Sequence, residues 1–157
     1  MSDLISILMP MRNAQAYVGE ALASLLAQKG VDLEVVVVDD GSTDRSADVV
    51  RGLSDSRIKL VPGPRRGIAA ALNAGLAAAT GDLCCRCDAD DWYPADRLAW
   101  QRDLLRDRPD VGAVCGTYTM VTATGKRILE QSWGERAESI SDEIRRGVGR
   151  THFCTFM

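Results

Sequence analysis

Three carboxylates lie within four residues of the chain, directly after a short apolar run. Asp88, Asp90 and Asp91 follow Leu83 to Cys87, a segment with the pattern of a buried strand. Like charges this close repel each other, so they require a cation or hydrogen-bond donors nearby. Because ligands of α/β sheets bind just beyond the carboxyl ends of strands, Asp88-Ala89-Asp90 is a candidate site for a divalent metal that carries a phosphate ligand. The alternative is a polar turn that ends the strand and caps the next helix.

Two other predicted strands also end in polar residues. The β-branched run from Leu33 to Val38 suits burial on both faces of a sheet, and it is followed by Asp39 and Asp40. A further loop, Pro62 to Gly67, carries two arginines. Carboxylates with a divalent cation and a nearby arginine suit a diphosphate ligand. Since parallel strands end at one edge of a sheet, Asp40, Asp88 and Asp90 are expected to converge on one crevice.

Strands and helices alternate four times, which predicts right-handed βαβ crossovers and a parallel sheet covered by helices. The predicted strands are Leu4 to Met9, Leu33 to Val38, Arg57 to Val61 and Leu83 to Cys87. The predicted helices are a stripe from Ala14 to Leu26, a helix capped by Ser42 or Thr43 that runs to Leu53, Ile68 to Ala79, and Ala95 to Arg106. Further on, the pattern predicts a hairpin of Val111 to Val121 with Arg127 to Trp133, a helix from Glu138 to Arg146, and a strand from His152 to Met157.

Composition excludes several classes of protein. The 157 residues favour one domain, and 46% hydrophobic residues suffice for a core. The formal charge of −3, with three lysines and no basic stripe, argues against a nucleic-acid partner. The apolar runs are too short to span a bilayer and the N-terminus resembles no leader peptide, so a cytoplasmic location is expected. Neither a P-loop nor a Gly-x-Gly-x-x-Gly dinucleotide motif occurs.

The five cysteines are expected to be free thiols. An odd number of cysteines in a chain without a leader peptide argues against disulfides. Cys84 would face opposite to Cys85 and Cys87 on a strand, so small buried hydrophobes are favoured over a zinc cluster.

Four segments in this order resemble the nucleotide-binding part of glycosyltransferase family 2, an inverting group with a GT-A fold. They are Ser6 to Asn13, Val35 to Asp44, Gly67 to Gly81 and Arg86 to Trp92, and the resemblance covers roughly Leu4 to Gly116. It implies a single GT-A (Rossmann-like) domain over residues 1–157, with a mostly parallel sheet flanked by helices and a mixed or antiparallel C-terminal portion. The implied activity is transfer of a sugar from a nucleoside-diphosphate sugar, a UDP-sugar, to a saccharide or lipid-linked acceptor with Mg²⁺ or Mn²⁺.

The resemblance also assigns roles to individual residues. Pro10 and Met11 would lie against the base, and Asn13 would belong to the same nucleotide-sugar site. Asp40 would accept a hydrogen bond from the uracil N–H, and Asp39 would orient the turn. Arg66, or Arg65, would approach the donor. Asp88 would contact the ribose or the metal, Ala89 would lie between the two carboxylates, and Asp90 would ligate the metal, which gives Asp88 and Asp90 as the metal residues. Arg86 could pair with a neighbouring carboxylate.

The family's general base has no counterpart here. It comes from an acidic motif after a segment that resembles His152 to Met157, so the chain is expected to end before the catalytic-base and acceptor region, and the missing regions could attach the protein peripherally to a membrane. Asp142-Glu143 is an acidic pair but precedes that segment, and His152 could line the acceptor side or be an ordinary strand residue. The catalytic residue is therefore unknown, and a nucleotide-sugar-binding module without transferase activity is the alternative function. A phosphotransfer domain is a third reading, but its downstream lysine is not in place.

Overall fold

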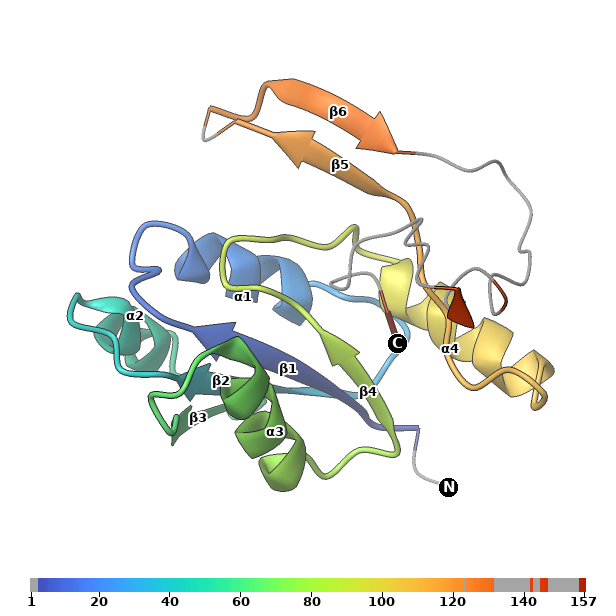
Figure 1. The fold of residues 1–157 in the computed structure, drawn as a ribbon, viewed down its shortest axis with the longest axis horizontal. Coiled ribbons are helices and arrows are strands. Elements are labelled where there is room, and N and C mark those ends of the chain that lie inside the picture. The colour runs from blue at the N-terminus through green and yellow to red at the C-terminus, as the bar shows by residue number, and fades with distance from the viewer. Residues whose placement is uncertain (1–2, 123, 132–141, 143–144, 147–155) are drawn as a thin grey trace.

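A computed structural model describes residues 3–122, 124–131, 142, 145–146 and 156–157 (Figure 1). The elements in chain order are β1 (Ile5–Met11), α1 (Val18–Leu26), β2 (Leu33–Asp39), α2 (Ser46–Gly52), β3 (Ile58–Pro62), α3 (Ile68–Ala78), β4 (Leu83–Arg86), α4 (Arg97–Asp107), β5 (Tyr118–Val121) and β6 (Arg127–Gln131). The first four strands form one parallel sheet in the order β3-β2-β1-β4, and β5 and β6 form an antiparallel pair. This is the predicted fold class.

The central strand β1 sets the carboxyl edge of the sheet. It pairs with β2 on one side, from Ile5 opposite Leu33 to Met11 opposite Asp39. On the other side it pairs with β4 up to Leu8 opposite Arg86. The segments after β1, β2 and β4 therefore leave the sheet at the same edge, as βαβ topology requires.

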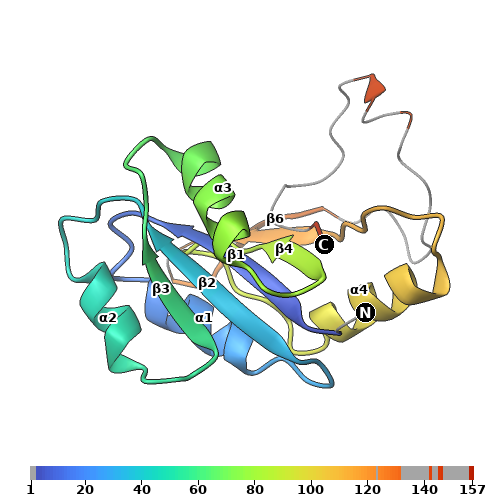
Figure 2. The same ribbon diagram turned by 90° about the horizontal axis from the view of Figure 1, so that it is seen from below.

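Helices cover both faces of the sheet, as Figure 2 shows, with α3 on one face and α1, α2 and α4 on the other. The larger hydrophobic cluster joins alternate residues of β1 and β2 to α1, and it includes Ile7, Val37 and Leu22. The smaller cluster joins the intervening residues of the strands to α3, and includes Val38 and Ala71. Both faces of β2 are buried, which explains its run of valines, and each buried aliphatic side chain contributes roughly 1.5–3 kcal/mol.

Close backbone approach fixes one strand connection. The N–H of Gly81 donates to Ser6 Oγ at 2.9 Å, and a Cβ at position 81 would lie 2.4 Å from the carbonyl oxygen of Leu4. No other residue type fits there. Ser6 Oγ in turn donates to Glu34 Oε1 at 2.6 Å, and the N–H of Thr80 donates to the same oxygen at 2.6 Å. This cluster ties β1, β2 and the end of α3 together at the amino edge of the sheet.

The start of α2 differs from the prediction. Ser42 and Thr43 do not cap this helix, which begins at Ser46, and the carboxylate of Asp44 accepts the N–H of Ser46 at 3.0 Å. The reason is that Ser42 and Thr43 bond instead to Asn13 in the neighbouring loop.

The predicted strand from Val111 to Val121 is also too long, because regular pairing covers only β5. Gly112 and Gly116 interrupt the segment before it. Val114 there makes an isolated two-bond pair with Met157, in which each N–H donates to the other's carbonyl oxygen at 2.9 and 2.8 Å. The hairpin of β5 and β6 stands apart from the main sheet and exposes apolar side chains, among them Ile128 and Leu129 (Figure 1).

The remaining C-terminal predictions fall mostly outside the described residues. Trp133, most of the helix from Glu138 to Arg146 and residues 152–155 of the last strand lie there. Among the described residues, no helix combines the length and apolar character needed to cross a membrane.

Candidate functional site

The carboxylate of Asp40 is buried, with 5% of the residue exposed, and it holds the loop before α3. Oδ1 accepts the N–H of Arg65 at 2.6 Å, and Oδ2 accepts the N–H of Gly67 at 2.8 Å. Arg65 has a positive φ of 57°, and Gly67 has a φ of 87° at the start of α3. Two backbone donors directed at one carboxylate stabilise a loop conformation that a non-glycine residue seldom adopts. We refer to residues 63–67 held in this way as the Asp40 loop.

Asp39 points the other way and lines a cavity. Its Oδ1 accepts the N–H of Ser42 at 2.8 Å, which forms a tight turn after β2. The cavity holds about 370 Å³ and is also lined by Arg51 and Arg65. Asp39 thus holds the turn, and its part in a nucleotide-sugar site stays a prediction. It lies on the α2 side of β2, whereas Asp40 lies on the α3 side.

Asn13 joins the loops that follow β1 and β2. Its N–H donates to Ser42 Oγ at 3.0 Å, and its Oδ1 accepts the N–H of Thr43 at 2.8 Å. Asn13 has a positive φ of 54°, a conformation that asparagine tolerates better than most residues. One step further on, the N–H of Ala14 donates to Ser46 Oγ at 2.8 Å. Asn13 therefore links the two loops with both its own N–H and its side-chain oxygen.

Pro10 and Met11 belong to the end of β1. Pro10 is half-buried, whereas Met11 is only 2% exposed and packs in the larger hydrophobic cluster. The reason is that β1 continues to residue 11, so Met11 falls on the same face as the other core residues of the strand. The side chain of Met11 is consequently not open to a ligand, and its carbonyl accepts the N–H of Asp40 at 2.9 Å.

Asp88 is bound at both oxygens by one guanidinium group. Arg86 Nε lies 2.8 Å from Oδ1 and Arg86 Nη2 lies 2.9 Å from Oδ2, with 21% and 22% of the two side chains exposed. Cys85 and Cys87 face the larger cluster, so Arg86 and Asp88 lie on the α3 face by alternation. The predicted pairing of Arg86 with a neighbouring carboxylate is confirmed. Asp40 and Asp88 thus share one edge and one face of the sheet.

Tyr93 and Arg97 brace this segment, which sequence reasoning missed. The Tyr93 hydroxyl donates to the carbonyl of Arg86, and the Tyr93 N–H donates to Ser24 Oγ at 3.1 Å. The Arg97 guanidinium lies 3.6 Å from the centre of the Tyr93 ring, a cation–π contact that ties the start of α4 to the acidic segment. The signal available in the sequence was an aromatic residue two positions after the acidic run, with an arginine four positions beyond it.

Asp90 is exposed, and within the described part of the chain it makes no hydrogen bond or ion pair. Ala89 is 6% exposed and packs in the core, which leaves Asp88 and Asp90 outside the core on either side of it. No group of three or more potential metal ligands occurs among the described residues. Mg²⁺ and Mn²⁺ nevertheless suit such a donor set, because they commonly take one or two carboxylates and complete their shell with substrate phosphates and water.

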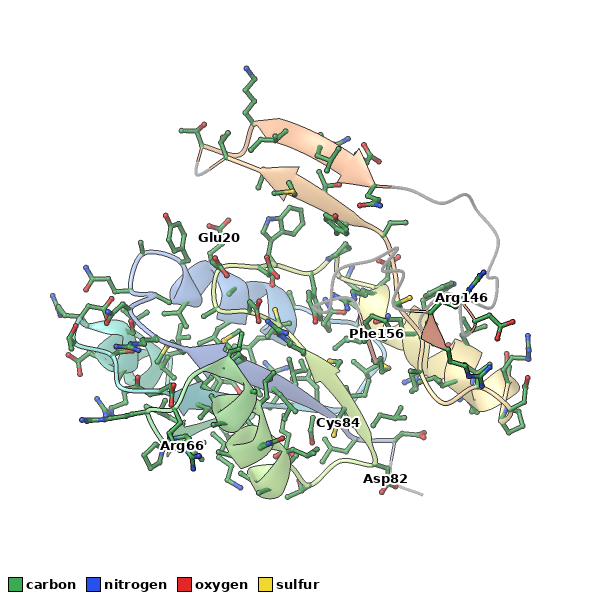
Figure 3. The ribbon with its side chains drawn as sticks, viewed as in Figure 1. Glu20, Arg66, Asp82, Cys84, Arg146 and Phe156 are labelled. Atoms are coloured by element: carbon green, nitrogen blue, oxygen red, sulfur yellow. The ribbon has the colours of Figure 1, made fainter. Side chains whose placement is uncertain are left out.

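Arg65 and Arg66 differ in where their side chains lie. A Cβ on Gly41 would lie 3.0 Å from Arg65 Cγ and 3.1 Å from its Nε, so the Arg65 side chain crosses the turn after β2. Arg66 is exposed, and in the view of Figure 3 it lies on the opposite side of α3 from Cys84. Of the two arginines, only Arg65 lines the cavity beside Asp39.

The prediction of small buried hydrophobes holds for two of the four described cysteines, and Cys154 lies outside the described residues. Cys84, Cys85, Cys87 and Cys115 are free thiols, and two of them, Cys85 and Cys87, are buried. Burial raises the pKa of the Cys85 thiol to about 12 and raises that of Cys87 well above its ordinary value. Neither is a thiolate at neutral pH, so neither suits nucleophilic chemistry.

No general base is identified in the described part of the chain. Asp142 lies in an exposed ion pair with Arg145 at 2.9 Å. Glu143 and His152 lie outside the described residues.

Comparison with known families gives one match that spans nearly the whole chain. The model of "Glycosyl transferase family 2" matches residues 6–156. A protein of Haemophilus influenzae described as an uncharacterized glycosyltransferase is 39% identical over 128 residues, which is 80% of this chain and 51% of the relative. An uncharacterized glycosyltransferase of Nostoc is 44% identical over 94 residues, 57% of this chain and 29% of the relative. The chain thus spans about half, or less, of the length of these relatives.

Solved structures show the same fold. The mannosyltransferase PcManGT from Pyrobaculum calidifontis, in complex with GDP-Man and Mn²⁺, matches with a TM-score of 0.66 and 38% identity, over 73% of this chain and 35% of that one. TarS from S. aureus in complex with UDP-GlcNAc matches with a TM-score of 0.66 and 25% identity, over 86% of this chain and 39% of that one.

Proposed function

Because the chain belongs to glycosyltransferase family 2, we propose that it forms the donor-binding part of an enzyme that transfers a sugar from a nucleoside-diphosphate sugar to a saccharide or lipid-linked acceptor. The observation that carries the proposal is the shared position of Asp40 and Asp88 at the carboxyl edge and on the α3 face of the sheet, beside the exposed Asp90. Ligands of open α/β sheets bind outside this edge.

The nucleoside would lie against the loops after β1 and β2. Pro10 offers a half-buried apolar surface. The side-chain oxygens of Asn13 and Asp39 hold the two loops in place by accepting backbone N–H groups. Each carboxylate oxygen has two lone pairs, so Asp40 can accept a base N–H in addition to the N–H of Arg65 or Gly67. Uracil has such an N–H, and we propose UDP-sugars as donors. GDP is the control, because a structural neighbour binds GDP-Man.

The diphosphate would lie near the Asp88-Ala89-Asp90 segment, with Mg²⁺ or Mn²⁺ held there. One structural neighbour is a complex with Mn²⁺, which supports the use of a divalent cation. A bound cation neutralises the negative charge of the leaving diphosphate. Arg66 or Arg65 would approach the donor, since both belong to the loop that Asp40 holds. Arg66 is exposed, and the Arg65 side chain crosses the turn after β2.

A second candidate function is a nucleotide-sugar-binding module without transferase activity. The observation that favours it is that many described acidic side chains after Asp91 lie in surface ion pairs: Asp103, Asp110, Glu130 and Asp142. A general base must lie within hydrogen-bond reach of the acceptor hydroxyl. An assay for hydrolysis and transfer of UDP-sugars separates the two functions, since a binding module gives no turnover.

Calorimetry with UDP in the presence of Mn²⁺, and again with a chelator, tests the donor site. We expect metal-dependent binding by the purified chain, and we expect Asp90→Asn to abolish the dependence on metal. Asp110→Asn is the control, because Asp110 is an exposed carboxylate in an ion pair with Arg108. Absence of UDP and GDP binding with either metal would overturn the proposed donor site.

A further inference from the structure

Arg86 and Asp88 form a closely matched ion pair inside the acidic segment. The two N···O distances of 2.8 and 2.9 Å use both carboxylate oxygens, a side-on arrangement that only a planar guanidinium makes. Four-fifths of each side chain is shielded from solvent. A pair in this position is screened by water less than a surface pair, and it keeps a positive charge beside the carboxylate.

The backbone around this pair is braced by α1 and by the segment between β4 and α4. The Tyr93 hydroxyl bonds to the carbonyl of Arg86, and Ser24 on α1 accepts the N–H of Tyr93. The N–H of Asp91 donates to the carbonyl of Asp88 at 3.0 Å, which closes a turn across the acidic segment. These bonds fix the backbone of the segment that carries the Arg86–Asp88 pair.

A cation at Asp88 would compete with this guanidinium for the same two oxygens. It would also lie close to a second positive charge, which disfavours its binding electrostatically. Asp90, two residues on, is exposed and makes no hydrogen bond or ion pair within the described residues. The two carboxylates of the Asp-x-Asp sequence are thus in different electrostatic surroundings.

We propose that Arg86 is a positioning residue that keeps Asp88 out of metal coordination and leaves Asp90 as the carboxylate that holds the cation. Asp88 then serves the donor as a fixed hydrogen-bond acceptor. This inference rests on the proposed function, because it concerns the same metal-dependent donor site. The new element is Arg86, whose ion pair accounts for different roles of two carboxylates that the resemblance names together as metal residues.

The test measures Mn²⁺ binding without nucleotide, by the loss of the electron paramagnetic resonance signal of free Mn²⁺. Arg86→Met removes the guanidinium and keeps a side chain of similar length. We expect Mn²⁺ to bind about tenfold more tightly to this variant, because Asp88 becomes available as a second ligand. UDP affinity at saturating Mn²⁺ should fall, since Asp88 is then no longer fixed for the donor. If Arg86 had only a structural role, the variant would bind both Mn²⁺ and UDP more weakly than the wild type.

Two further proteins complete the experiment. Arg86→Met combined with Asp88→Asn should return Mn²⁺ affinity to the wild-type value. Arg108→Met is the matched control, because Arg108 and Asp110 form the same bidentate pair at the same spacing on the surface, with 57% and 64% of the side chains exposed. It should change neither measurement. Thermal unfolding of each variant checks that it is folded.

The experiment separates failure of the Arg86 inference from failure of the proposed function. Unchanged, weaker or undetectable Mn²⁺ binding by Arg86→Met would overturn the inference. A gain that persists in the double variant would also overturn it, because Arg86 would then act on Asp90 by charge alone. Failure of the wild-type chain to bind nucleoside diphosphates would count against the proposed function, whereas the nucleotide-free Mn²⁺ comparison would still decide the role of Arg86.

Discussion

The carboxylate of Asp40 accepts the backbone N–H of Gly67 at 2.8 Å, although 27 residues separate the two in the chain. Its other oxygen accepts the N–H of Arg65. One side chain at the end of β2 therefore sets the path of the loop that leads into α3. The Asp40 loop and the predicted base contact depend on the same carboxylate, so they can be tested together.

Asp40→Ala should destabilise the fold and weaken nucleotide binding. Two backbone donors lose a charged acceptor, which should cost about 1–3 kcal/mol in the free energy of unfolding measured with urea. In calorimetry, UDP affinity should fall more than affinity for inorganic diphosphate, since the proposed bond is to the base. Equal losses for both ligands would exclude the base contact. Asp48→Ala is the control, because its ion pair with Arg51 is exposed and should contribute little.

Gly63→Ala should be destabilising for a steric reason. A Cβ at this position would lie 2.8 Å from the Cα of Asp40 and 3.0 Å from the carbonyl oxygen of Asp39. Because backbone atoms cannot move aside easily, we expect a loss of roughly 1–3 kcal/mol in urea denaturation. Gly52→Ala at the end of α2 meets nothing within 4 Å and should be neutral or stabilising by up to about 1 kcal/mol. Equal stability of the two variants would contradict the close contact.

Asn13→Ala should be less stable than Asn13→Gly. Both variants lose the bond from the N–H of Thr43 to Asn13 Oδ1, but only glycine adopts the φ of 54° without strain. The difference between the two variants should be about 1 kcal/mol in favour of glycine, measured by thermal unfolding. A greater stability of the alanine variant would mean that the loop relaxes out of the left-handed conformation.

Glu34 should make the stability of the chain sensitive to acid. Burial raises its pKa, but hydrogen bonds from Ser6 and Thr80 and the nearby charge of Lys59 outweigh burial, so the pKa lies below the ordinary 4.5. A carboxyl whose pKa is lower in the folded state contributes stability that is fully present above 4.5 and is lost as pH falls through the folded value. Urea midpoints measured from about pH 6 down to about pH 3 should therefore fall less steeply for Glu34→Gln than for the wild type. Identical slopes would contradict this contribution.

Much of the fold follows from local sequence pattern. The valine run of β2, the alanine-rich helix α3 and the glycine and proline residues between elements give the order of strands and helices, because periodicity and turn preferences act over a few residues. The strand from Val111 was predicted too long because strand pairing depends on residues far along the chain. Apolar composition alone cannot tell a paired strand from an extended segment whose pairing partner lies far along the chain.

The sequence by itself determined that Asp40, Asp88 and Asp90 follow strands of a parallel sheet, and therefore that they lie at one edge. Only the tertiary structure decided what each carboxylate contacts. The bonds of Asp40 to the loop before α3, and the bracing of the Arg86–Asp88 pair by Tyr93 and Ser24, join residues from different elements. Side chains are oriented by the packing of such elements against one another, and this depends on contacts between residues far apart in the chain.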